Sequence, residues 1–497
     1  MLYNALLILL IIVVVIAIAA LAFLQIYLRT LIKKMQEESD QEDVDRHGNL
    51  KVTFQIREHF APAKLPEIAI GERNFPMRMR VDLQRVIDQL FATNQLISYF
   101  SGIRMESQRE GATLAECLAS KSYSAPLFAP PEYEDVDIGE AQPVRCLKSG
   151  IWFWEEGGEK LVALLALSPS HYGPGDIRFQ MASLNTPAGS QLSRRYLQQV
   201  EETVQQASCY RGKILSLEQS DRDYSGLSTG ITVHKLNTVA REQVILPQVT
   251  LDLLDRNVIQ FARQRAALAK LGQATKKGLL FYGPPGTGKT HTIHYLAQAL
   301  PGHTTFLITA EQVGYLAEYM VLARLMQPSI VVLEDVDLIA RDRGSMVSAC
   351  EESLLNKLLN EMDGLKPKAD ILFILTTNRP ESLEAALASR PGRVDQAIEF
   401  PLPDEDGRRK LMQLYAGNIQ ISSELTEYIV TRTERVSASF IKELVRRSAQ
   451  FHLEVNGTDQ LQIADVEQAL DEMLFTGGAL NLKLLGAEAR QVGFIAG

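Results

Sequence analysis

Cysteine is scarce in this sequence. Its 497 residues include only Cys117, Cys146, Cys209 and Cys350, which lie far apart and form no Cys-x-x-Cys pair or Cys/His cluster. Structural zinc sites use closely spaced ligands, so this distribution argues against a zinc-binding module. A long chain with a few unpaired cysteines is typical of a reducing compartment.

The sequence also lacks an excess of positive charge. It has 51 lysines and arginines against 60 aspartates and glutamates, a formal net charge of -9 and a pI of about 5.6. Such a protein has no overall attraction for nucleic acid, so we expect no nucleic-acid partner unless a local basic groove exists. With 46% apolar and 22% charged residues the chain is globular in composition, and its length is enough for about three domains.

Charge is absent from most of the N-terminal segment. Leu6 to Leu24 is a run of apolar residues without a charged or strongly hydrogen-bonding side chain. As a helix it would be about 29 Å long, close to the ~30 Å hydrocarbon core of a bilayer. A secretory signal peptide would need a positive region before a shorter apolar run, and the chain opens Met1-Leu2-Tyr3-Asn4 instead. We therefore expect a transmembrane anchor over residues 1–28.

Positive residues follow the apolar run. Arg29, Lys33 and Lys34 place this end of the span in the cytoplasm by the positive-inside rule. We therefore expect a single-pass membrane protein with its soluble part on the cytoplasmic side. The stretch Glu37–Asp45 is strongly acidic, so residues 29–49 are expected to form a solvated, charged linker.

Residues 50–235 are expected to form a middle domain of mixed α+β type. The apolar patterns predict helices over Val81–Phe100 and Leu192–Ala207, a hairpin of strands Ile151–Trp154 and Leu161–Leu167, and a strand over Tyr210–Leu217. The aromatic cluster Trp152-Phe153-Trp154 is expected in the core. This region has no recognisable catalytic constellation, so its position suggests a module that binds a substrate or an adaptor.

A glycine-rich segment follows the apolar run Gly278–Tyr282 and precedes a predicted helix over His291–Leu300. The segment consists of Gly283, Pro284, Pro285, Gly286, Thr287, Gly288, Lys289 and Thr290. It matches the pattern G-x-x-x-x-G-K-[ST], in which backbone N–H groups and the helix N-terminus surround a phosphate chain. Lys289 would reach the β- and γ-phosphates and Thr290 would hold Mg²⁺, so the sequence predicts a site for ATP and Mg²⁺.

A pair of carboxylates follows the next strand of buried character, Ser329–Leu333. Glu334 and Asp335 would lie at the carboxyl end of this strand, where parallel sheets open into the nucleotide cleft. One carboxylate is needed to orient the Mg²⁺ shell, and the next can polarise the attacking water.

Polar residues also follow the apolar run Ile371–Leu375. The amide of Asn378, at the end of Thr376-Thr377-Asn378, could bridge the γ-phosphate and the attacking water. Further on, Arg390 and Arg393 flank a Pro-Gly turn that would hold them rigidly. An arginine that reaches the γ-phosphate bound by a neighbouring subunit can raise the rate about 10³- to 10⁵-fold.

These motifs resemble those of AAA ATPases of the AAA+ superfamily. The matches are Gly283–Thr290 (Walker A), Ile330–Asp335 (Walker B), Asn378 (sensor 1), Leu383–Asp395 (second region of homology), Glu351–Leu365 and Ser437–Lys442. The resemblance implies an α/β ATPase subdomain with a parallel sheet over residues 236–403 and a helical lid over 404–475, followed by a tail over 476–497. It places Arg390 and Arg393 at the family's arginine fingers. It also implies a homo-oligomeric ring, a hexamer or alternatively a heptamer, that acts on protein substrates.

Three features depart from the family pattern. The carboxylate order is Glu334-Asp335 where the family usually has Asp-Glu, so Glu334 would take the metal role and the shorter Asp335 the catalytic one. The stretch 309–327 is short, and Val313-Gly314-Tyr315 matches the pore-loop motif poorly. The chain reads Val244-Ile245-Leu246-Pro247 where Asp-Ile-Gly-Gly is common. These features resemble the mitochondrial inner-membrane ATPases that translocate the folded Rieske protein.

Membrane-anchored AAA proteases carry a His-Glu-x-x-His zinc site, which this sequence lacks. We therefore expect an ATP hydrolase that is not a protease. The leading hypothesis is a membrane-anchored ATPase that remodels or chaperones proteins. The alternatives are a translocase for folded proteins and an ATP-gated membrane scaffold with little turnover.

Overall fold

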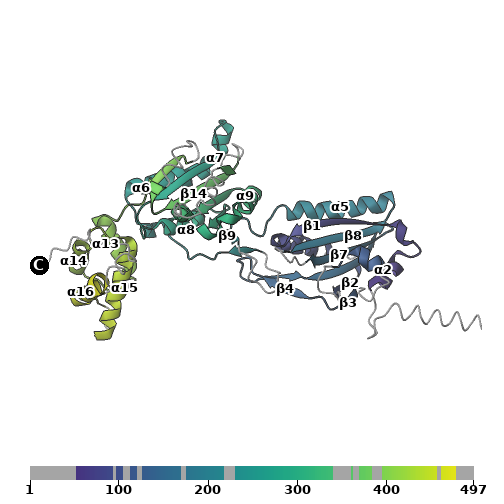
Figure 1. Cartoon of the computed structure of the whole chain (residues 1–497), viewed down its shortest axis with the longest axis horizontal. Helices are drawn as coiled ribbons and strands as arrows, with labels where there is room; N and C mark the ends of the chain where they lie inside the picture. The colour runs from purple at the N-terminus through teal and green to yellow at the C-terminus, as the bar shows by residue number, and fades with distance from the viewer. Residues whose placement is uncertain are drawn as a thin grey trace, which may run out of the picture. The chain divides into compact units, whose positions relative to one another are not determined.

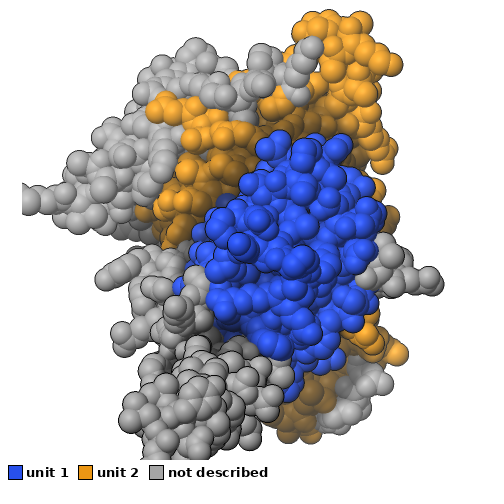
Figure 2. Space-filling model, turned by 90° about the vertical axis from the view of Figure 1, so that its right-hand side faces the viewer, with its two compact units in different colours: residues 1–136, 144–205, 220–230 blue, residues 137–143, 206–219, 231–497 orange. Residues whose placement is uncertain are grey.

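The computed structural model describes residues 52–92, 97–104, 112–119, 126–168, 175–217, 230–339, 360–361, 369–382, 394–455 and 460–476. The predicted transmembrane anchor, the acidic linker and nearly all of the tail lie outside these residues. Within the described ranges, no helix has the length and apolar character needed to cross a bilayer. The chain divides into two compact units, which Figure 2 colours separately.

Unit 1 is built on a six-stranded antiparallel sheet with the order β1-β8-β7-β6-β2-β3. Its strands are β1 (Ile68–Pro76), β2 (Ile97–Arg104), β3 (Leu127–Ala129), β6 (Ser149–Glu156), β7 (Glu159–Ser168) and β8 (Asp176–Leu184). A separate ribbon pairs β4 (Tyr133–Val136) with β5 (Val144–Leu147). The helices of this unit are α2 (Val52–Phe60), α3 (Arg80–Ala92), α4 (Leu114–Ala119) and α5 (Pro187–Val204).

Both faces of this sheet are covered at its centre, which explains why β6 and β7 contain continuous apolar runs. Trp152 and Trp154 pack with residues of α3 and α5, and Figure 1 shows α5 lying along the sheet. Ile151 and Phe153 point to the opposite face and pack with residues of α2 and α4. The aromatic cluster is therefore part of the core, as expected, and it contributes to both of its layers.

The predicted hairpin is confirmed and the first predicted helix is only partly correct. β6 and β7 pair up to Glu156 and Glu159, and the turn residues Gly157 and Gly158 have φ of +61° and +83°, as a type I′ turn requires. The helix expected over Val81–Phe100 ends at Ala92, and its last apolar residues belong to β2. A short run of β-branched and aromatic residues fits both the helical and the strand period. Its pairing with β6 makes this run a strand.

Unit 2 contains a seven-stranded sheet with the order β10-β9-β12-β13-β14-β11-β15, parallel except for β10. Its strands are β9 (Ile214–Leu217), β10 (Ile231–Val233), β11 (Lys277–Tyr282), β12 (Thr304–Ile308), β13 (Ser329–Leu333), β14 (Ile371–Thr377) and β15 (Gln396–Glu399). The helices around it include α6 (Gln248–Leu254), α7 (Phe261–Lys270), α8 (Lys289–Ala299), α9 (Leu316–Leu325) and α10 (Val336–Ile339). The predicted α/β fold with a parallel sheet is confirmed.

The strand order brings the predicted motifs together. β14 lies between β13 and β11, so the segments that follow these three strands are neighbours at the carboxyl edge of the sheet. The order along the chain reverses there, since β12, β13 and β14 run in sequence and the earlier strand β11 comes next. Ligands of open α/β sheets bind at such reversal points.

The boundary between the units differs from the one expected at residues 235 and 236. Unit 2 includes residues 137–143 and 206–219. β9, expected in the middle domain, pairs in parallel with β12 and belongs to the sheet of unit 2. Lys213 Nζ donates a hydrogen bond of 2.6 Å to the carbonyl oxygen of Ile138. A strand pattern in a sequence does not say which sheet the strand joins, and this is why the boundary was misplaced.

The C-terminal part of unit 2 is helical. It consists of α13 (Glu405–Ala416), α14 (Ser423–Arg432), α15 (Ala438–Val455) and α16 (Ile463–Asp471), which share one apolar core. Asp404 and Ser422 cap the first two helices by accepting hydrogen bonds from the backbone N–H groups of Gly407 and Leu425. This region corresponds to the predicted lid, and α15 begins within the predicted Ser437–Lys442 motif.

Candidate nucleotide site

The glycine-rich segment connects β11 directly to α8, whose first residue is Lys289. Gly283 and Gly286 have φ of +149° and +76°. A Cβ atom at Gly283 would lie 2.2 Å from the carbonyl oxygen of Phe400, and one at Gly286 would lie 2.0 Å from Ser439 Oγ. The loop therefore requires glycine at both positions, because other residues are strained by the backbone conformation and have no room for a side chain.

Lys289 is buried at the base of this loop. Its Nζ donates hydrogen bonds of 2.8 and 3.0 Å to the carbonyl oxygens of Gly283 and Pro284. Burial lowers the pKa of Lys289 to about 8, and the nearby carboxylates of Asp335 and Asp337 oppose this effect. The ammonium group is thus held inside the loop that would wrap a phosphate chain, where it is weakly solvated and ready to pair with an anion.

The two residues expected to hold Mg²⁺ are in contact. The Thr290 hydroxyl donates a hydrogen bond of 2.7 Å to Glu334 Oε1. The backbone N–H of Glu334 in turn donates to the carbonyl oxygen of Ile308 at 3.0 Å, which fixes the residue at the end of β13. A hydroxyl and one carboxylate suit Mg²⁺, because this ion uses few protein oxygens and completes its octahedron with water and phosphate oxygens.

Asp335 and Asn378 form a second polar pair next to the first. The Asn378 side-chain amide donates a hydrogen bond of 2.9 Å to Asp335 Oδ1. Asp335 has φ of +51°, an uncommon backbone conformation for a residue other than glycine, and its N–H donates to the Thr376 hydroxyl at 2.9 Å. The turn after β13 therefore holds the Asp335 carboxylate toward the end of β14.

Asp337 was not singled out in the sequence analysis, yet it organises this edge of the sheet. Its buried Oδ1 accepts hydrogen bonds from the Thr377 hydroxyl at 3.0 Å and from the Asn378 backbone N–H at 3.1 Å. These bonds fix the backbone from which the Asn378 amide reaches Asp335. The only sequence signal for this role is the closeness of Asp337 to the Glu334-Asp335 pair.

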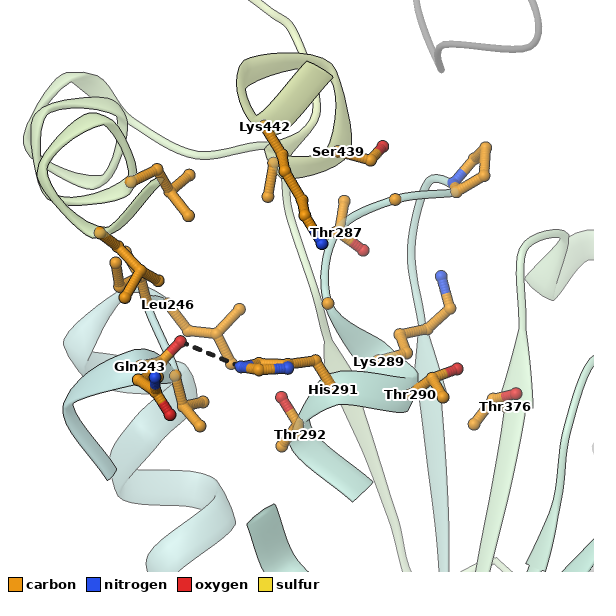
Figure 3. A pocket seen from close by; sticks show the side chains of 18 of the residues that line it. Gln243, Leu246, Thr287, Lys289, Thr290, His291, Thr292, Thr376, Ser439 and Lys442 are labelled. Atoms are coloured by element: carbon orange, nitrogen blue, oxygen red, sulfur yellow. Dashed lines mark hydrogen bonds between the residues drawn. The ribbon is translucent and has the colours of Figure 1, made fainter. Parts of the chain in front are cut away.

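A cavity of about 620 Å³ adjoins the loop, within the size range of small-molecule sites. Four parts of the chain line it: the glycine-rich loop with the start of α8, the segment Gln243–Leu246, the ends of β13 and β14 with Asp335, Thr376 and Asn378, and the helical lid. The lid contributes Leu411, Leu414, Tyr415, Ala438, Ser439 and Lys442. In Figure 3 the side chain of Lys442 points from α15 toward the loop near Thr287, and the N–H of Ser439 donates to the carbonyl oxygen of Gly286 at 3.1 Å.

The structure thus brings five expected residues together: Lys289, Thr290, Asp335 and Asn378 line the cavity, and Glu334 contacts Thr290. The two expected arginine fingers, Arg390 and Arg393, lie outside the described residues, and their role stays a prediction. The lining residues from the lid and from Gln243–Leu246 were not assigned to the site from the sequence, because their proximity depends on the tertiary fold.

The fold and this constellation define a P-loop nucleotide-binding domain with a helical lid. Residues 279–402 match the model of the ATPase family associated with various cellular activities (AAA). The chain therefore contains an AAA ATPase domain, and the resemblance seen in its motifs is confirmed.

Curated relatives align over about half of the chain. The proteasome-activating nucleotidase of Methanothermobacter thermautotrophicus is 30% identical over 262 residues, which cover 50% of this chain and 62% of that protein. The ATP-dependent zinc metalloprotease FtsH of Thermotoga maritima is 29% identical over 253 residues, covering 48% and 40%. The protein of the same name from Acidimicrobium ferrooxidans is 32% identical over 235 residues, covering 44% and 35%.

These relatives correct one expectation. We expected an ATPase that is not a protease, and this exclusion is wrong because several relatives are named ATP-dependent zinc metalloproteases. The exclusion relied on a zinc motif that is missing from these 497 residues. However, the chain spans only about 40% of the FtsH sequence from Thermotoga maritima, so a missing motif carries no weight. ATPase activity is supported.

Proposed function

We propose that this protein is a membrane-anchored AAA ATPase that hydrolyses ATP in a ring oligomer and uses the energy to remodel or chaperone protein substrates. The observation that carries the catalytic part is that three polar groups meet at the carboxyl edge of the sheet: buried Lys289, the Thr290–Glu334 pair and the Asp335–Asn378 pair. Each group corresponds to one requirement of phosphoryl transfer, namely charge compensation, metal orientation and activation of water.

In this proposal Lys289 exchanges its hydrogen bonds with the loop carbonyls for the phosphate oxygens of ATP. Thr290 and Glu334 would hold Mg²⁺, which supplies charge neutralisation at the β- and γ-phosphates when bound. Since Oδ1 of Asp335 accepts from Asn378, we assign Oδ2 as the atom that takes the proton of the attacking water. Asn378 then has two tasks: its amide orients this carboxylate and lies beside the water.

The assembly and location are part of the same proposal. The chain would form a ring, most often a hexamer in this superfamily, with Arg390 or Arg393 reaching the ATP bound by the neighbouring subunit. The apolar run Leu6–Leu24 would anchor each subunit in a membrane, and the basic residues after it favour a cytoplasmic ATPase. The names of the relatives point to protein substrates, since they are an FtsH protease and a nucleotidase that activates the proteasome.

Steady-state phosphate release from the full-length protein tests the proposed activity. The wild type is expected to hydrolyse ATP, Lys289→Ala to lose both binding and turnover, and Asp335→Asn to bind ATP without turnover. Wild-type rates in Asp335→Asn would contradict the assignment of the general base. No release by the wild type together with intact ATP binding would favour the ATP-gated scaffold instead, a candidate suggested by the shorter carboxylate at Asp335.

A translocase for folded proteins is a second candidate, and one observation favours it. The stretch Val313-Gly314-Tyr315 lies in a short 3₁₀ helix (Ala310–Tyr315), and the Val313 side chain is buried. A pore loop that grips an unfolded chain needs an exposed aromatic–aliphatic pair, which this arrangement does not provide. The two modes differ experimentally. If the protein moves a tightly folded, crosslinked substrate across a membrane at an undiminished rate, the translocase is supported. If crosslinking blocks transport, threading is supported.

A further inference from the structure

The nucleotide cavity has two chemically different ends. At one end lie the glycine-rich loop and Lys289, which suit phosphates. At the other end the walls are largely apolar and come from two separate parts of the chain, Val244–Leu246 and the lid residues Leu411, Leu414 and Tyr415. A flat heteroaromatic base is the group that such walls hold well.

His291 lies between these two ends. It follows Thr290 directly in the first turn of α8, and it lines the cavity. Figure 3 shows its ring extending from α8 toward Gln243. The ring Nε2 is 3.2 Å from the backbone carbonyl oxygen of Gln243. A carbonyl oxygen can only accept, so Nε2 carries the hydrogen and donates it.

The partner of this bond is itself fixed. Gln243 ends a short 3₁₀ helix (Arg241–Gln243) in which its N–H donates to the Ala240 carbonyl oxygen at 3.1 Å. Its side-chain Oε1 accepts from the Ala240 N–H at 2.8 Å. The next residue, Val244, is buried. The His291 ring therefore connects the helix that begins at the phosphates to a rigid turn that leads into the base wall.

We propose that His291 is a positioning residue for the base of the bound nucleotide. This inference rests on the proposed ATP binding and adds to it a residue that sets the geometry of the base subsite. Without the ring, the segment Gln243–Leu246 loses its hydrogen bond to α8 and keeps only packing contacts such as that of Leu246 with the core. The base wall is then held less firmly in register with the phosphate loop. The phosphate contacts, which come from Gly283–Thr290, are unaffected.

The experiment compares two ligands on the full-length protein by calorimetry in Mg²⁺: the non-hydrolysable analogue adenosine 5′-(β,γ-imido)triphosphate and inorganic tripolyphosphate. His291→Ala is expected to bind the nucleotide about tenfold more weakly, the effect of losing roughly one hydrogen bond, and to bind tripolyphosphate as the wild type does. In turnover assays KM for ATP should rise by a similar factor while kcat is unchanged. His291→Gln, whose amide is also a donor, should recover part of the affinity.

The matched control is His294→Ala. His294 lies one turn further along α8, is partly buried, and is not among the residues that line the cavity, so its loss should leave both affinities unchanged. Equal weakening of nucleotide and tripolyphosphate binding in His291→Ala would show that the ring supports the loop as a whole and would overturn the proposal. Unchanged nucleotide binding would overturn it as well. A wild-type protein that binds neither ligand would refute the proposed ATP site itself.

Discussion

The side-chain amide of Asn378 donates a hydrogen bond of 2.9 Å to Oδ1 of Asp335, and this bond joins the ends of two neighbouring strands. Asp335, which carries the carboxylate, has a left-handed backbone conformation. The backbone N–H of Asn378 is held by a hydrogen bond to the buried carboxylate of Asp337. Both groups are therefore oriented before any substrate binds, as efficient general-base catalysis requires.

Asn378→Ala should reduce kcat for ATP hydrolysis by about 10²-fold, within the usual contribution of a positioned general base, because Asp335 loses the donor that orients it. The affinity for a non-hydrolysable ATP analogue should stay within about twofold of the wild type. Single-turnover phosphate release and calorimetry measure the two effects. A parallel fall of binding and turnover would mean that Asn378 acts through the fold of the site.

Thr290→Val and Glu334→Gln should each raise the Mg²⁺ concentration needed for half-maximal hydrolysis. Because the two side chains share one hydrogen bond of 2.7 Å, their effects should not add. The double variant is expected to fall short of the summed single effects by about 0.5–3 kcal/mol. The double-mutant cycle is measured by titrating the ATPase rate with Mg²⁺ for the wild type, the two single variants and the double variant. Strictly additive effects would argue that the two side chains do not act together.

The buried ammonium group of Lys289 should lower the free energy of unfolding at neutral pH in the absence of nucleotide. Burial lowers its pKa from 10.5 to about 8, which corresponds to roughly 3 kcal/mol. Between pH 8 and 10.5 the unfolded chain binds more protons than the folded one. The destabilising effect of Lys289 on the folded state therefore decreases as the pH rises through this range. We expect Lys289→Met to raise the free energy of unfolding at pH 7, and the advantage over the wild type to shrink above pH 8.

Urea unfolding at pH 7 and pH 9.5 checks this prediction. Lys276→Met is a suitable control, since this residue precedes β11 and its side chain is less buried than that of Lys289. A pH-independent difference between Lys289→Met and the wild type would contradict the role of burial.

Gly286→Ala should abolish tight nucleotide binding. The added methyl group would lie 2.0 Å from Ser439 Oγ and 3.0 Å from Ser437 Oγ, on a backbone with φ of +76°. The loop or the start of α15 must then move, and either change opens the cavity. Gly314→Ala is the matched control, because a Cβ atom there would have no atom within 4 Å. Calorimetric titration with the ATP analogue distinguishes the two variants, and wild-type affinity in Gly286→Ala would disprove the tight approach of the lid.

Local patterns were enough to predict the ATPase core but not the whole site. The glycine-rich loop, Glu334-Asp335 and Asn378 each follow a strand of buried character, and parallel strands end at a common edge, so their proximity could be expected from the sequence. The roles given to these residues stay predictions until they are measured. Asp337 and His291 carry no motif of their own, and their hydrogen bonds to Asn378 and to the Gln243 carbonyl oxygen follow only from the fold. Lys442 ends the Ser437–Lys442 motif, but its place in the cavity wall depends on the packing of the lid.

The lack of three-dimensional information in local patterns also explains where the fold predicted from the sequence was wrong. The apolar run after Ala92 satisfied a helical period, whereas pairing with β6 makes it strand β2. The strand predicted over Tyr210–Leu217 is shorter, Ile214–Leu217, and only its pairing with β12 assigns it to the ATPase sheet. In both cases the deciding partner is distant in the sequence, and a local pattern contains no information about it.

The interleaved path of the chain limits how the protein can be dissected. The ATPase unit takes residues 137–143 and 206–219 as well as the segment from 231 onward, while residues 144–205 belong to the other unit. No single truncation point can therefore release an intact ATPase. A fragment that starts at residue 236 would lack β9 and β10, leave the edge of β12 without its partner, and be prone to aggregate through that edge. Transferring the ATPase unit to another protein would require grafting three separate segments. The two units of this chain are therefore expected to have been inherited together.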